Sequence, residues 1–70
     1  MYTVKAETDR IINKLCFKDG DTVKQGDEIL HTELMKMMIP MAAPVSGKIT
    51  YKVAVFDYVY AGMTMAEIEE

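Results

Sequence analysis

The chain has 70 residues, of which 50% are hydrophobic and 27% are charged, and its formal net charge is −3 at pH 7. A chain of this length forms one small domain and buries only about 60% of the surface that its unfolded form exposes, so a large enclosed substrate pocket is not expected. The acidic balance and the scattered basic residues argue against nucleic-acid binding. No apolar run reaches the length of a membrane span, so we expect no membrane insertion.

Strand-like segments follow one another along the chain. Residues 10–17, 28–34 and 48–55 are rich in β-branched and aromatic side chains, and their apolar residues fall mainly on alternate positions, which is the period of a β-strand. Pro40 and Pro44 lack a backbone N–H, so any strand near them lies at a sheet edge or is interrupted. Turn residues separate about eight short strands, and no helix is predicted. This pattern indicates an all-β antiparallel barrel or sandwich.

An internal repeat divides the chain into two similar halves. Four positions of the first half recur in the second at an offset of about 36 residues: Asp21, Val23, Gly26 and Glu33 recur as Asp57, Val59, Gly62 and Glu69. The repeat predicts quasi-two-fold symmetry, with equivalent strands from each half. Asp21 and Asp57 are expected to close turns through bonds from side chain to backbone.

One turn departs from the repeat. Phe56 stands where the first half has Gly20, and the segment leading into the Phe56 turn is one residue shorter than its counterpart. Glycine often supplies positive φ in such turns, whereas phenylalanine does so poorly. We therefore expect the turn around Phe56 to follow a different backbone course from the turn around Gly20.

The most distinctive motif is Glu-Leu-Met-Lys-Met at residues 33–37, which lies between the two repeats. Its lysine, Lys36, falls where the chain reverses direction before a strand that begins near Met38. Lys36 is therefore predicted to project from an exposed hairpin tip with a rigid base, a position that suits entry into another protein's active site. A solvated turn lysine is the alternative, but it leaves the flanking Met35 and Met37 unexplained, because a tip offers no core for them to enter.

Other reactive side chains are few. Cys16 is the only cysteine and His31 the only histidine. A catalytic Cys16–His31 pair is disfavoured, because unpaired cysteine commonly packs as a small hydrophobe and His31 matches an acidic, solvent-facing position in the repeat. Met38 and Met41 are expected to fill gaps in the core. The chain offers no acid–base pair, phosphate loop or metal cluster, so we expect no catalytic and no metal-binding residues. A single cysteine fits a reducing intracellular compartment such as the cytoplasm.

The motif at residues 33–37, followed by Ala-Pro-Val-Ser-Gly at residues 43–47, resembles the attachment motif of biotinyl domains, the biotin carboxyl carrier family. The resemblance covers nearly all of residues 1–70, which we interpret as a single biotinyl/lipoyl attachment domain. It implies a flattened β-barrel of two four-stranded sheets, with biotin in amide linkage to Lys36. It also implies that Met35 and Met37 help a biotin protein ligase to choose this lysine. The sequence departs from the family at Leu34, usually a small residue, and at Arg10, usually glycine.

By this resemblance the domain carries a cofactor and catalyses nothing alone. Biotin on Lys36 would carry CO₂ between a biotin carboxylase and a carboxyltransferase, or would work in reverse with a decarboxylase. One alternative is a lipoyl carrier of a 2-oxoacid dehydrogenase complex, but the lipoyl lysine is typically flanked by Asp and Ala. Another is an interaction module whose lysine is never modified. The acceptor substrate, and the choice between a free subunit and part of a longer polypeptide, stay open.

Overall fold

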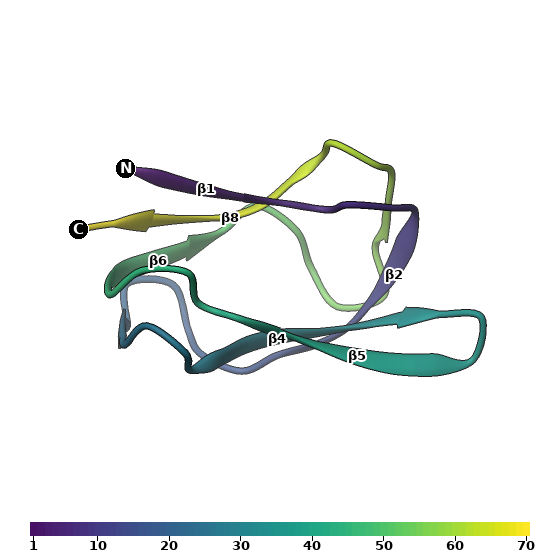
Figure 1. Ribbon diagram of the computed structural model, residues 1–70, viewed down its shortest axis with the longest axis horizontal. Coiled ribbons are helices and arrows are strands. Elements are labelled where there is room, and N and C mark those ends of the chain that lie inside the picture. Colours follow the sequence, from purple (N-terminus) through teal and green to yellow (C-terminus); the bar gives the residue numbers. More distant parts are fainter.

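The computed structural model describes all 70 residues and consists of eight β-strands without a helix (Figure 1). The strands are β1 (Tyr2–Lys5), β2 (Arg10–Leu15), β3 (Thr22–Val23), β4 (Glu28–Leu34), β5 (Met37–Ala42), β6 (Gly47–Tyr51), β7 (Tyr58–Val59) and β8 (Thr64–Glu69). They form two four-stranded antiparallel sheets, with the orders β1-β8-β6-β3 and β5-β4-β2-β7. The predicted all-β fold is confirmed, and Pro40 lies on the edge strand β5 as expected. None of the structure is a helix of the length and apolarity that crossing a membrane requires.

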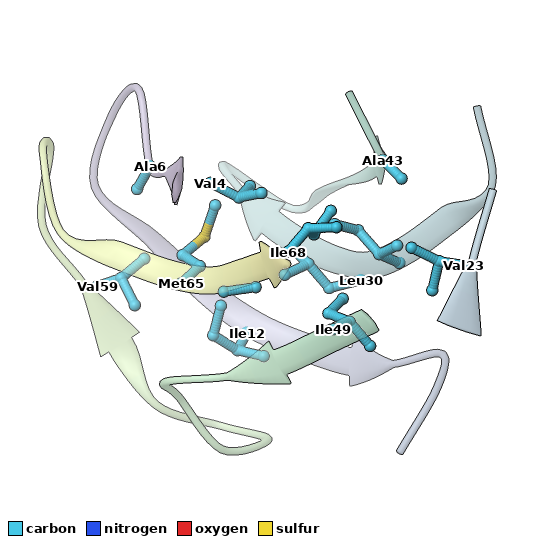
Figure 2. Close-up of a cluster of buried hydrophobic side chains, with 12 residues drawn as sticks. Val4, Ala6, Ile12, Val23, Leu30, Ala43, Ile49, Val59, Met65 and Ile68 are labelled. Carbon is cyan, nitrogen blue, oxygen red and sulfur yellow. The ribbon is translucent and has the colours of Figure 1, made fainter. Parts of the chain in front are cut away.

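The two sheets enclose one hydrophobic core. In β6, for example, Ile49 is fully buried between the exposed Lys48 and Thr50, which is the alternation expected of a half-buried strand. Side chains from both sheets point toward one another in the space between them (Figure 2). The buried cluster comprises Val4, Ala6, Ile12, Val23, Ile29, Leu30, Ala43, Ile49, Val59, Met65, Ala66 and Ile68. Full burial of each valine, leucine or isoleucine contributes about 1.5–3 kcal/mol, so this cluster is the main source of stability.

The two halves of the chain make equivalent hydrogen bonds. The Gly26 N–H donates to the Ala43 carbonyl at 2.8 Å, and its counterpart Gly62 donates to the Ala6 carbonyl at 2.8 Å. Both glycines lie in the left-handed region, with φ of 95° and 89°. A β-carbon is disfavoured there, which explains why glycine recurs at this place in both halves. The quasi-two-fold symmetry predicted from the repeat is therefore confirmed.

The turns around Gly20 and Phe56 are also equivalent, so the prediction that they differ was wrong. Gly20 has a φ of 90° and Phe56 has a φ of 74°. The N–H of Gly20 donates to the Ile49 carbonyl at 2.8 Å, and that of Phe56 donates to the Ile12 carbonyl at 2.7 Å. Phenylalanine thus adopts the left-handed conformation that glycine supplies in the first half.

An aspartate closes each of these turns, as expected. Asp21 Oδ2 accepts the N–H of Lys18 at 2.9 Å, and Asp57 Oδ2 accepts the N–H of Ala54 at 2.8 Å. In each turn the aspartate N–H also donates to the carbonyl of that same partner residue. These paired bonds hold the backbone of both turns in one conformation.

The one-residue difference in length between the halves lies in a strand. The pairing of β2 with β4 shifts register between Ile12 and Lys14, which leaves Asn13 as the extra residue of a β-bulge. The counterpart strand β6 pairs with β8 without any shift. The bulge absorbs the extra residue, and the following turn keeps its shape.

The domain is elongated, with extents of 32 × 18 × 17 Å. Both chain termini lie at one end of its long axis, and the turn of the β4–β5 hairpin lies at the other (Figure 1).

Candidate functional site

The β4–β5 hairpin carries Lys36 at its tip. Strand β4 ends at Leu34, strand β5 begins at Met37, and these two residues pair directly across the hairpin. The two loop residues have positive φ, 53° at Met35 and 64° at Lys36. Positive φ at both positions is the signature of a type I′ turn, the tightest connection that matches the twist of a β-hairpin. Lys36 therefore lies at the hairpin tip that the sequence predicted.

This turn is held in an unfavourable conformation by its neighbours. Type I′ turns favour Asn-Gly, and a residue with a β-carbon costs about 1–2 kcal/mol in the left-handed region. The ladder between β4 and β5 runs from Glu28↔Ala42 to Leu34↔Met37 and stabilises the reversal. The strands thus fix the direction in which the tip projects.

Thr32 anchors the middle of the hairpin. It is the only buried polar residue. Its hydroxyl donates to the Ile39 carbonyl at 3.3 Å and accepts a bond from Nη1 of Arg10 at 3.3 Å. The same Nη1 lies 3.4 Å from Sδ of Met41. Arg10 therefore ties β2 to both strands of the hairpin, a role that the sequence signalled only as a departure from the usual glycine.

The side chains around the tip are apolar and exposed. Met35 is 87% exposed and Met37 is 67% exposed. Met38 is 60% exposed, so the prediction that it fills a core gap was wrong: it lies on the opposite face of β5 from Ile39, which pairs with the buried Thr32. Met41 packs against the core, as expected. Three neighbouring methionines are thus exposed, and exposed apolar clusters commonly mark a contact surface.

The amine of Lys36 is unencumbered. The chain contains two ion pairs, His31 Nε2 to Glu28 Oε1 at 2.9 Å and Lys52 Nζ to Glu67 Oε1 at 3.3 Å. Neither pair involves Lys36, which is exposed. Its Nζ is therefore accessible to an incoming enzyme without first breaking an internal contact.

No hydrogen bond joins Cys16 and His31. The backbone N–H of Cys16 donates to the Ile29 carbonyl at 3.0 Å, and the imidazole of His31 contacts the carboxylate of Glu28. Burial raises the pKa of the Cys16 thiol above its usual value, which depletes the reactive thiolate. Cys16 therefore has the properties of a structural thiol.

Tyr51 is a structural residue that the sequence did not reveal. Its hydroxyl donates to the Ile29 carbonyl and accepts the N–H of Phe17 at 3.1 Å. Because Tyr51 lies in one sheet and Ile29 in the other, this hydroxyl joins the two sheets. Only the three-dimensional pairing of the strands brings these groups together.

Comparison with known proteins agrees with this fold. Residues 3–68 match the biotin/lipoyl family described as "Biotin-requiring enzyme". The chain is 35% identical over 66 residues to the biotinylated protein TB7.3 homolog of Mycobacterium leprae (strain TN), and the match covers 93% of each chain.

A solved structure of a single-chain, multi-domain long-chain acyl-CoA carboxylase contains the same fold. The TM-score is 0.83, and the match covers 93% of this chain with 19% sequence identity. The chain spans only 7% of that carboxylase, and at this identity the likeness concerns the fold alone. From the family match and the mycobacterial relative, we conclude that this chain belongs to the biotin/lipoyl attachment domain family.

Proposed function

We propose that this chain is a biotin carboxyl carrier domain and that Lys36 is its attachment residue. The observation that carries the proposal is the tip geometry: an exposed, unpaired lysine in a type I′ turn, between methionines that are 87% and 67% exposed. The methionine flanks favour biotin over lipoate, and the name of the mycobacterial relative, a biotinylated protein, supports the same choice.

The residues at the tip fit this cofactor. The Nζ of Lys36, once deprotonated, would form an amide bond with the carboxyl group of biotin, and a biotin protein ligase would supply the activation. Neither ion pair of the chain engages Lys36, which is exposed at the turn of the hairpin. Bound biotin would supply a ureido nitrogen that takes up and releases CO₂. The contribution of the domain is to hold the attachment point on a rigid hairpin.

The partners follow from this carrier role. A biotin carboxylase would load the arm, and a carboxyltransferase or decarboxylase would unload it. Tethering makes each transfer intramolecular, with an effective concentration in the millimolar range for a short flexible link. The likeness in fold to part of an acyl-CoA carboxylase supports such an assembly. A reducing compartment such as the cytoplasm is the proposed setting.

Lys36→Arg tests the site, since it keeps the positive charge and removes the nucleophilic amine. Co-expression with a biotin ligase should biotinylate the wild-type chain on Lys36 and should leave Lys36→Arg unlabelled on an avidin blot, with an unchanged circular dichroism spectrum. Lys24→Arg is the matched control, because Lys24 is also an exposed lysine next to a tight turn, and it should be labelled normally.

Peptide mass mapping and the intact mass from the native host complete the test. Biotin on Lys14, Lys24 or Lys52 with Lys36 bare would overturn the assignment of the site. Lipoate on Lys36 in the native host would keep the site and replace the function.

A further inference from the structure

The methionines of this chain lie in contrasting environments. Met35 and Met37 are the most exposed apart from the N-terminal residue, and Met65 is fully buried. The exposed fractions are 74% for Met1, 87% for Met35, 67% for Met37, 60% for Met38, 40% for Met63 and 0% for Met65, and Met41 is partly buried against the core. The thioethers open to solvent therefore include both neighbours of Lys36.

We propose that Met35 and Met37 form a reversible oxidation site that controls recognition of Lys36. The inference rests on the proposed function, since it concerns access of a ligase to that lysine. It adds a chemical switch to the tip: the thioether form is recognised, and the sulfoxide form is poorly recognised.

The oxidant class is a peroxide, and the step is a two-electron oxygen transfer. A lone pair on Sδ attacks one oxygen of hydrogen peroxide, so that an S–O bond forms as the O–O bond breaks. The departing hydroxide takes the proton from the transferred oxygen and leaves as water. Sulfur is oxidised to a sulfoxide and the peroxide is reduced. The step requires access of the peroxide to sulfur, which 87% exposure at Met35 and 67% at Met37 provide.

The sulfur atoms that pack in or against the core are less available than those of Met35 and Met37. Met65 is excluded from solvent, and the sulfur of Met41 lies against Arg10 at the base of the hairpin. Cys16 is partly buried beside the core. The methionines next to Lys36 are therefore expected to oxidise before the methionines that pack in the core.

Oxidation would change recognition without changing the fold. A sulfoxide turns an apolar, flexible side chain into a polar one with a strong hydrogen-bond acceptor. Met35 and Met37 contribute little to the core, so the hairpin keeps its conformation. An apolar ligase surface that receives thioethers would have to bury the new S=O dipole without a donor, which slows modification by about tenfold. Methionine sulfoxide reductases reverse the oxidation and would restore recognition.

The test uses purified, unmodified chain with Cys16→Ser, which removes the thiol side reaction. Hydrogen peroxide is added and then destroyed with catalase, and peptide mass mapping locates the sulfoxides. Biotin ligase, ATP and biotin follow, and the rate of avidin-shifted product is measured. We expect sulfoxide at Met35 and Met37 before Met41 and Met65. We also expect a rate about tenfold lower than that of the untreated chain. Recovery should follow treatment with reductases for both sulfoxide epimers.

Two variants locate the effect, each compared with its own untreated form. Met35→Leu with Met37→Leu should lose its sensitivity to peroxide, whereas Met63→Leu should keep it. An unchanged rate in a wild-type tip fully oxidised at both positions would overturn the inference, as would sensitivity that persists in the double leucine variant. If the leucine variant is a poor ligase substrate, the recovery of the biotinylation rate after reductase treatment still shows whether methionine oxidation caused the loss. If untreated chain takes up no biotin on Lys36, the proposed function itself fails; if it does and oxidation has no effect, only this inference fails.

Discussion

The variant Phe56→Gly should be more stable to unfolding than the variant Phe56→Ala. Phe56 has a φ of 74° and is 79% exposed, so its conformation is set by the turn while its side chain contributes little packing. Phe56→Gly and Phe56→Ala both remove that side chain. The two variants differ only in whether a β-carbon is forced into the left-handed region.

The magnitude follows from two opposing terms. A β-carbon in the left-handed region costs about 1–2 kcal/mol, which alanine retains and glycine removes. Glycine also gives the unfolded chain more freedom, which opposes folding by about 0.4–1 kcal/mol. The free energy of unfolding of the glycine variant should therefore exceed that of the alanine variant by about 0.5–1 kcal/mol. In a domain of this size that difference raises Tm by roughly 2–8 °C.

Thermal unfolding followed by circular dichroism measures this difference, and urea titration gives the free energy of unfolding. The control is Val55, which precedes Phe56 in the same turn and lacks positive φ. There the order should reverse, with Val55→Ala more stable than Val55→Gly. An alanine variant at position 56 that equals or exceeds the glycine variant would refute the left-handed assignment and the strain argument.

Gly47→Ala should destabilise the domain by about 1–3 kcal/mol, because a β-carbon there would overlap the Glu69 carbonyl on β8. Urea titration measures this loss, and an unchanged unfolding midpoint would contradict the close approach of β6 and β8. Tyr51→Phe removes the hydroxyl shared by Phe17 and Ile29 and should cost about 1–3 kcal/mol. Burial raises the pKa of Tyr51 above its usual 10.0, so the folded state favours the neutral phenol. The stability that this preference contributes is fully present below pH 10 and is lost as pH rises through the folded pKa. Wild-type stability should therefore fall more steeply above pH 10 than that of Tyr51→Phe; parallel pH profiles would show that Tyr51 titrates normally.

The fold and the hairpin tip were predictable because they depend on local patterns. Alternation around Ile49 gives a strand, and recurring glycine and aspartate give equivalent turns in two halves. Lys36 lies between those halves, where the chain must reverse. The sequence could not predict the turn at Phe56, because hydrogen bonds to the rest of the chain outweigh the preference of phenylalanine for negative φ. Bonds from the Phe56 N–H to Ile12 and between Asp57 and Ala54 contribute about 0.5–1.5 kcal/mol each, enough together to offset the conformational cost.

Features that depend on strand register could not be predicted from the sequence either. Whether Met38 faces the core is decided by its pairing with Glu33, and the local run of methionines has no clear alternation. The bulge at Asn13 becomes visible only when β2 is aligned with β4. The contacts of Arg10 join residues far apart in the chain, so nothing local signals them.

The termini and the Lys36 hairpin lie at opposite ends of the domain, so a rotation about the termini is converted into a large displacement of Lys36. A polypeptide joined at either end would attach at one end of the long axis, about 32 Å from the far end, where the hairpin turns. The displacement of the far end equals the pivot angle multiplied by this length. A pivot of half a radian would therefore carry Lys36 through half the length of the domain, a distance comparable with its 17 Å width. Rotation at the attachment point would thus displace the lysine by this distance without bending either sheet.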